Sequence, residues 1–203
     1  MTARIESLVE PRYRVAQVND QQRQTLLKVA RDAVEAAVNR RPAPKSESED
    51  PQLNAPCGCF VTLKNQGRLR GCIGQFTSDS PLIELVAEMA KAAATSDPRF
   101  FADPIEPSEL EQLDIEISVL SPLQRTEDPL SLRLGVDGIY IKQGRLSGCF
   151  LPQVAEETGW TKDQFLSYCC AHKAGLADDA WKDPETEVYL FTADVFGATF
   201  AEI

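Results

Sequence analysis

The six-residue phrase Gly-Arg-Leu-x-Gly-Cys occurs twice in the chain, and each copy places a thiol beside glycine and arginine. The first copy lies in QGRLRGCIGQF at residues 66–76 and the second in QGRLSGCFLPQ at residues 143–153. In the first copy Arg68, Arg70 and Cys72 occupy alternate positions, so in a strand their side chains would share one face. Positive neighbours favour the thiolate, which is the nucleophilic form of cysteine. The spacing therefore predicts a reactive thiol at Cys72.

The same residues also fit a purely structural interpretation, in which a buried cysteine lies beside exposed arginines. Gly71 and Gly74 have no side chains, so either a ligand or another stretch of backbone could approach them closely. The second copy has Ser147 where the first has Arg70, and it lacks the later glycine. We therefore expect the first hairpin to carry function and the second, with Cys149, to serve packing.

The six cysteines and single histidine raise the question of a metal or a disulfide. The segments CGC at 57–59 and CCAH at 169–172 resemble metal ligands, but structural zinc sites favour cysteines separated by two to four residues and repeated as two knuckles. We expect reduced cysteines packed as small hydrophobic residues and no metal site. A redox pair between Cys72 and Cys149 and a role for His172 as a base stay open as minor alternatives.

Composition narrows the class of protein. The net charge is -10 and the basic residues are dispersed, so no nucleic-acid partner is expected, because such binders concentrate positive charge on one face. No apolar run approaches the roughly 18 residues of a membrane helix. The N-terminal segment MTARIESLVEPRYRV has no uninterrupted hydrophobic stretch, so we expect neither a secretory signal nor a membrane anchor. The predicted location is the cytoplasm.

The elements that would position Cys72 can be read from periodicity. Apolar residues at helical spacing predict a helix over about 20–40, with Asp20 as its N-cap. The segment from about 41 to 56 is rich in proline, serine and acidic residues, which predicts a mobile surface loop. Each copy of the phrase lies in the second strand of a predicted β-hairpin, and a proline that opens a helix follows each hairpin.

Residues 113–120, LDIEISVL, alternate strictly between apolar and mostly polar positions and predict a strand with one face in the core. Hairpins imply antiparallel pairing, so we expect an α+β fold with mostly antiparallel strands. The repeated hairpin and helix predict an internal duplication, arranged as two interlocked subdomains.

Several segments together resemble the AMMECR domain family. They are LRGCIG, the preceding GCFVTLK, a helix ending in SDPRF, the strand IEISVLS, LPQV, and KAGL before Trp181. The resemblance implies a single AMMECR-type domain over 1–203, with a larger and a smaller subdomain and a groove between them. Such domains also occur as the A component of the AmmeMemoRadiSam set, which implies radical-SAM and Memo-like proteins as partners. It implies no established reaction, and it leaves substrate and cofactor unassigned.

The resemblance makes Cys72 the usual active-site candidate of the family. Two functions are then possible: an enzyme that uses Cys72 as a nucleophile, or a non-catalytic partner or substrate-carrying module in the same system. Asp97 and Arg99 are expected to form a structural pair in the connector after the helix. The local pattern and the resemblance together nominate Cys72, Arg70, Glu116 and Lys173 as catalytic residues, and Arg68, Gly71, Gly74, Asp97, Arg99 and Gln153 as binding residues.

Overall fold

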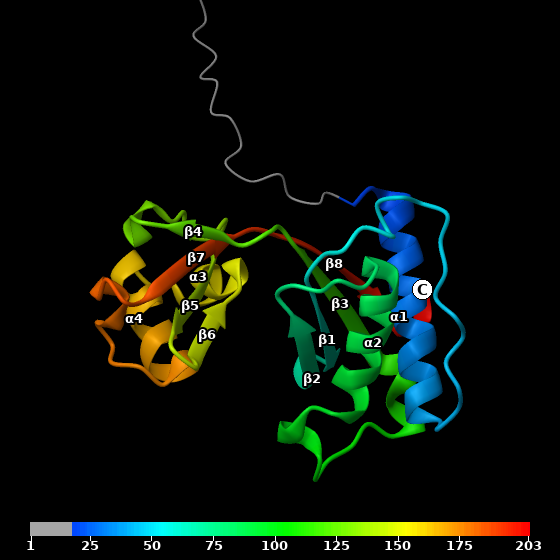
Figure 1. Ribbon diagram of the computed structural model, residues 1–203. Helices are drawn as coiled ribbons and strands as arrows, with labels where there is room; N and C mark the ends of the chain where they lie inside the picture. The colour runs from blue at the N-terminus through cyan, green and yellow to red at the C-terminus, as the bar shows by residue number, and fades with distance from the viewer. Residues whose placement is uncertain (1–17) are drawn as a thin grey trace, which may run out of the picture.

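Two four-stranded antiparallel sheets organise the chain in the computed structural model, which describes residues 18–203 (Figure 1). The strand orders are β2-β1-β3-β8 and β4-β7-β5-β6. This arrangement confirms the α+β class and the antiparallel pairing predicted from the hairpins. The strands of the first sheet are β1 Cys59–Asn65, β2 Arg68–Gln75, β3 Leu113–Leu120 and β8 Ala193–Thr199, and those of the second are β4 Gln124–Thr126, β5 Gly138–Gln143, β6 Leu146–Phe150 and β7 Glu187–Phe191.

The two sheets repeat one topology and exchange a strand. In the first, hairpin β1–β2 is followed by helix α2 (Leu82–Thr95) and by β3, which pairs with β1. In the second, hairpin β5–β6 is followed by helices α3 (Pro152–Thr158) and α4 (Lys162–Cys169) and by β7, which pairs with β5. After β3 the chain passes to the second sheet, where β4 pairs with β7. After β7 it returns to the first sheet, where β8 pairs with β3. The predicted subdomains are therefore interlocked by a reciprocal strand exchange, visible in Figure 1 as two crossing segments.

Helices α1 (Asp20–Val38) and α2 cover one face of the first sheet (Figure 1). Leu26, Ala30 and Val34 recur at helical spacing and are fully buried in the core. The N-cap is Asn19 rather than the predicted Asp20. The Asn19 side chain accepts a hydrogen bond from the Gln22 backbone, and the Gln22 side chain accepts one from the Asn19 backbone, a reciprocal capping box that Asp20 cannot form from one position later.

The segment from 41 to 56 contains neither helix nor strand, but its second half is held to the core. Leu53 is 2% exposed, and its carbonyl accepts a hydrogen bond from the Ile83 backbone N–H. Asp50 accepts a bond from the Gln22 side chain. The prediction that this segment packs poorly is therefore wrong for its second half, because one apolar residue anchors it.

The second sheet buries its own core against α3, α4 and a π-helical turn at Cys170–Ala174 (η4). Ile139 and Ile141 of β5 face Phe165 and Leu166 of α4 in this core. Gly175 ends the helical segment in the left-handed region at φ 69°, the terminator predicted for this glycine. Each sheet therefore has one face covered by its own helices and one face left free of them.

Candidate functional site around Cys72

Cys72 lies on the helix-free face of the first sheet. Its partner across the hairpin is Thr62, and Thr62 pairs in turn with Glu116 on β3, so the three side chains form a row across the sheet. The Thr62 hydroxyl lies 3.2 Å from the Cys72 sulfur, and Thr62 is 8% exposed. A hydroxyl that donates to sulfur stabilises a thiolate, because it supplies a hydrogen bond to the charged form.

The backbone of Cys72 is held on both sides by the connector after α2. The Cys72 N–H donates to Asp97 Oδ2 at 2.9 Å, and an Arg99 Nη donates to the Cys72 carbonyl at 3.3 Å. Arg99 also binds the Asp97 carboxylate at 2.6 Å. The Arg99 hydrogen bond, assisted by the Cys72 N–H, lowers the pKa of the buried Asp97 to about 2. The predicted pairing of Asp97 with Arg99 is confirmed, and the pair fixes Cys72 in place.

Arg70 does not lie beside Cys72, so the prediction of a shared face is wrong. Leu63 pairs with Gly71, and Lys64 pairs with Leu69, which leaves Arg70 as an extra, bulged residue that breaks the alternation. Its side chain is 3% exposed and forms a structural cluster. The guanidinium donates to Asp103 at 2.8 Å, to Glu109 at 3.0 Å and to the Pro104 carbonyl at 3.0 Å.

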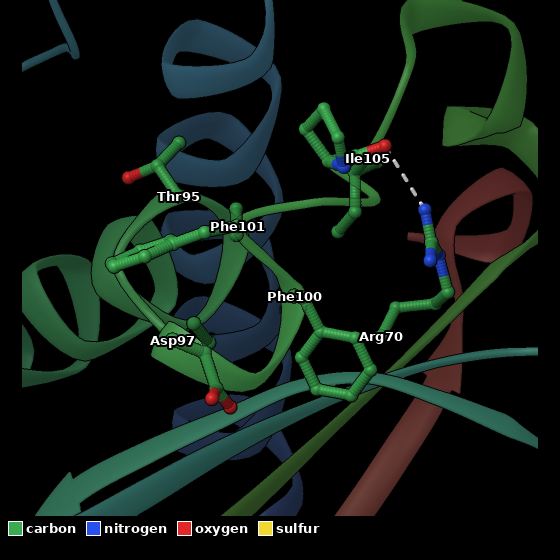
Figure 2. Close-up of a pocket in the computed structure, with 9 residues that line it drawn as sticks. Arg70, Thr95, Asp97, Phe100, Phe101 and Ile105 are labelled. Atoms are coloured by element: carbon green, nitrogen blue, oxygen red, sulfur yellow. Dashed lines mark hydrogen bonds between the residues drawn. The ribbon is translucent and has the colours of Figure 1, made fainter.

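A small cavity lies behind the strand of Cys72, on the side of the helices. Figure 2 shows Arg70 reaching across it to the Pro104 carbonyl, with Asp97 and Phe100 nearby. Its volume is about 90 Å³, enough for about three water molecules at about 30 Å³ each. The cavity is too small for a substrate of ordinary size.

The glycines of the phrase make room for the protein itself. A Cβ on Gly71 would lie 1.9 Å from the Ala93 carbonyl oxygen of α2, and one on Gly148 would lie 2.4 Å from the Ala174 nitrogen of η4. A Cβ on Gly74 would clash with the Phe60 ring and the backbone of β1. The interpretation as close backbone approach is therefore correct, and the interpretation of Gly71 and Gly74 as ligand-facing positions is wrong. The doubled phrase places a glycine under a helix and a cysteine on the opposite face.

Of the remaining predicted residues, only Glu116 lies on the same face as Cys72. Glu116 shares the face of Cys72 and forms an ion pair with Lys64 at 3.4 Å, both side chains being about one third exposed. Arg68 is largely exposed and binds Asp103 rather than any group at Cys72. Gln153 lies on α3 and lines a different cavity.

On the second sheet, Cys149 pairs with Tyr140, and Tyr140 pairs with Tyr189. Burial raises the pKa of Cys149 to about 11; the positive charge of Lys173 opposes this rise, and the charge of Cys72 adds to it. Lys173 thus acts on the second hairpin, where its ammonium also lies 5.6 Å from the Phe150 ring centroid.

Phe76, just after β2, links the helix-free faces of the two sheets. Its ring centroid lies 5.2 Å from that of Phe60 in the first sheet, 4.8 Å from that of Tyr140 and 5.6 Å from that of Phe191 in the second. A cavity of about 510 Å³ is lined by Phe76 and Cys57 among others, and Cys72 is not among its lining residues. The two free faces therefore approach one another, with Cys72 on one side and Cys149 on the other.

The other thiols behave as packing groups. Burial raises the pKa of each of them, which disfavours their thiolates. His172 is exposed, and its ring centroid lies 5.5 Å from that of Tyr168. Within residues 18–203, no group of three or more His, Cys, Asp or Glu side chains is arranged to hold a metal ion. The five thiols with raised pKa values are Cys57, Cys59, Cys149, Cys169 and Cys170.

Sequence reasoning did not find Thr62. If the hairpin kept the register of its Asn65–Arg68 pair without a bulge, Cys72 would lie opposite Val61. The bulge at Arg70 shifts the register by one and brings Thr62 opposite the thiol instead. No feature of the local sequence signals that shift.

These features define an α+β protein with two interlocked sheets and a thiol fixed on a free sheet face. The AMMECR1 family model matches residues 27–196, and the chain therefore belongs to the AMMECR1 family. A protein of Methanothermobacter thermautotrophicus is 42% identical over 179 residues, covering 85% of this chain and 92% of that protein. Protein TK0174 of Thermococcus kodakarensis is 40% identical over 190 residues, covering 88% and 91%.

The crystal structure of uncharacterized protein PH0010 from Pyrococcus horikoshii is similar in fold. The two structures superpose with a TM-score of 0.81 at 36% sequence identity. The alignment covers 89% of this chain and 93% of the PH0010 chain. This likeness supports the two-sheet architecture described above. Among residues 18–203, no helix has both the length and the apolar character required to cross a membrane.

Proposed function

We propose that the protein is an enzyme that uses Cys72 as a nucleophile. The observation that supports this best is the 3.2 Å contact from the Thr62 hydroxyl to the Cys72 sulfur, at a position whose N–H and carbonyl are both fixed by Asp97 and Arg99. A reactive sulfur needs a fixed direction and an electrostatic partner, and this arrangement supplies both.

The activating cation in this proposal is Arg99 and not Arg70. The hydrogen bond to Asp97 is the main cause that raises the pKa of Arg99, and the charge of Cys72 adds to it. The Arg99 guanidinium also donates to the Cys72 carbonyl, which keeps its positive charge near the thiol. In the reaction the sulfur donates its electron pair to the carbon of a polarised C=O bond of the substrate and forms a C–S bond, while the π electrons move to the oxygen, which takes up a proton from water. The thiol proton leaves to water or to Glu116, which lies one strand beyond Thr62 in the same row.

The partners in the proposal are a radical-SAM protein and a Memo-like protein, and the compartment is the cytoplasm. Membership of the AMMECR1 family supports the partners, because AMMECR domains form one component of that set. The helix-free face of the first sheet, with the Lys64–Glu116 ion pair at its exposed part, is where the substrate would reach the thiol.

A second candidate is a substrate-carrying module that holds an intermediate on Cys72 without converting it. One observation favours it. Within residues 18–203 the sulfur of Cys72 has a hydroxyl as its hydrogen-bond partner and neither an imidazole nor a carboxylate. Nucleophilic cysteines of enzymes normally have a base within hydrogen-bond reach.

The test is reconstitution with the radical-SAM and Memo-like proteins, comparing the wild type with Cys72→Ser and with the matched variant Cys149→Ser. An enzyme predicts that Cys72→Ser abolishes product while complex formation and the Cys149→Ser activity are retained. A carrier predicts that substrate-derived mass accumulates on Cys72 and that no product forms unless a partner is added. Full activity of Cys72→Ser would contradict both.

A further inference from the structure

A cavity of about 260 Å³ lies where helix α3 meets the beginning of β8. Its walls come from both halves of the molecule, since α3 belongs to the second and β8 pairs into the first sheet. Neither Cys72 nor any residue that contacts it lines this cavity. The inference drawn from it is therefore independent of the proposed thiol chemistry.

Two residues that line this cavity each carry a buried polar atom without a hydrogen-bond partner among the described residues. Thr192 is 6% exposed, and its backbone N–H donates to the Ser121 hydroxyl at 2.9 Å, but its own Oγ1 is unbonded. The side-chain oxygen of Gln153 is also buried and unbonded. A buried polar group without a partner is costly, so folded proteins rarely keep one without a use. Two such atoms on residues that line one cavity point to a hydrogen-bonding ligand there.

A carboxylate completes the polar lining. Glu156 is exposed on α3, and its carboxylate packs against the backbone turn at Gly135. A Cβ added to Gly135 would lie 2.9 Å from Glu156 Oε1. Among residues 18–203 Glu156 forms no ion pair, and neither Lys nor Arg lines the cavity. The polar lining thus consists of an amide oxygen, a hydroxyl and a carboxylate, all of which accept hydrogen bonds.

The rest of the wall is apolar and partly open. Val136 is 47% exposed and Val195 is 36% exposed, and both flank the cavity together with Pro152 and Ala193. Apolar side chains around a few convergent polar atoms are the usual composition of a small-molecule site. A ligand that matches this lining has a positively charged group with several hydrogen-bond donors, attached to a short apolar chain.

We propose that this cavity binds a protonated primary amine on an aliphatic stem. An ammonium offers three donors, which match the three acceptors of Gln153, Glu156 and Thr192, and its stem packs on the two valines. The net charge of -10 favours a cationic ligand over an anionic one. The ammonium belongs either to a free alkylamine or to a lysine side chain of another protein, and the experiment separates these sources.

The test is a titration of the full ¹⁵N-labelled protein, followed by the amide resonances of Gly135, Gln153 and Thr192. The probes are n-pentylammonium chloride, Nα-acetyl-lysine N-methylamide, and 1-pentanol as the neutral isostere of the first. We expect saturable shifts with an ammonium probe and at least about tenfold weaker binding of pentanol, since hydrogen bonds between a charged donor and these acceptors are stronger than those of a neutral hydroxyl. Tighter binding of the lysine probe would assign the site to a protein side chain, and tighter binding of pentylammonium to a free amine.

Matched variants make the result specific. Glu156→Gln and Thr192→Val should each weaken the ammonium probe by about tenfold. Their controls are Glu157→Gln, an exposed neighbour that does not line the cavity, and Thr186→Val, which removes another buried and unbonded hydroxyl elsewhere. Equal shifts with pentanol, no saturable shift with either ammonium probe, or equal weakening by Glu157→Gln would each overturn the proposal.

Discussion

The hairpins around Cys72 and Cys149 share a phrase but differ by one residue of chain. Thr62 and Cys72 face each other across the first hairpin, and Tyr140 and Cys149 do so across the second, which spans one residue fewer. The first hairpin absorbs its extra residue as the bulge at Arg70.

That difference separates two roles for one motif. In both hairpins the glycine lies against a helix and the cysteine points to the free face. Only the first hairpin opposes its cysteine with a hydroxyl and fixes it with the Asp97–Arg99 pair. The second opposes its cysteine with Tyr140 and buries it, which raises its pKa. The shared phrase therefore preserves packing, while the surroundings of the two cysteines differ in the way that the proposed function requires.

The largest expected effect is on stability, and it tests the feature that both hairpins share, a glycine packed against a helix. Gly71→Ala should lower the free energy of unfolding by about 3 kcal/mol or more, because the new Cβ would overlap a backbone oxygen of α2. Gly148→Ala should cost somewhat less, about 2 kcal/mol, since its contact is less close. Urea unfolding measures both. The controls are Gly67→Ala and Gly144→Ala, at open turn positions with positive φ, where about 1 kcal/mol is expected. A Gly71→Ala protein as stable as Gly67→Ala would show that α2 does not constrain this strand.

The second effect tests the difference in reactivity. A pKa of about 11 against an ordinary 9.0 leaves Cys149 with about 100-fold less thiolate at pH 8, so iodoacetamide should label it more slowly than an ordinary thiol, by up to about 100-fold. Cys72 should be labelled first, as measured by peptide mass spectrometry.

Two variants test whether Arg99 rather than Arg70 activates Cys72, as the proposed function requires. Arg99→Gln should slow its labelling several-fold, whereas Arg70→Met should leave the labelling rate of the folded protein unchanged while reducing its stability. Labelling of Cys149 before Cys72 would invert the comparison. A disulfide between the two on mild oxidation stays a prediction, tested by the same peptides.

The third effect concerns the connector that only the first hairpin has. The pKa of Asp97, about 2 against an ordinary 3.8, corresponds to about 2 kcal/mol of stability. Because the folded value is the lower one, this stability is complete above about pH 4 and is lost as the pH falls toward 2. Asp97→Asn should therefore be less stable at pH 7 and show a flatter acid dependence in urea unfolding. Asp79→Asn, which removes a carboxylate at an exposed position, is the control.

The smallest expected effect is at the Lys64–Glu116 ion pair on the same face. Both side chains are about one third exposed, so Lys64→Met should change stability by less than about 1 kcal/mol, and less still at high salt. A change above 2 kcal/mol in urea unfolding would mean that this pair is a structural element of the sheet rather than a solvated part of its free face.

Much of the fold was predictable because its signals are local. The strict alternation over residues 113–120 identified β3, and the turn at Gln66–Gly67, where both residues have positive φ, closes the first hairpin as expected. The strand exchange was harder, since which sheet receives β4 and β8 depends on contacts between distant segments. In the candidate site, Asp97 and Arg99 hold the backbone of Cys72 and Glu116 shares its sheet face, whereas Arg70, Lys173 and Gln153 lie elsewhere.

The sequence by itself determined the two hairpins, the doubled glycine and cysteine, and membership of the AMMECR1 family, because these depend on residue order and short-range periodicity. Only the tertiary structure decided that Arg70 leaves the face of Cys72, that Arg99 takes its place and that Thr62 meets the sulfur. The reason is register. One bulged residue reverses the alternation of side chains along a strand, and the burial of Arg70 against Asp103 and Glu109, more than thirty residues away, is what accompanies that bulge.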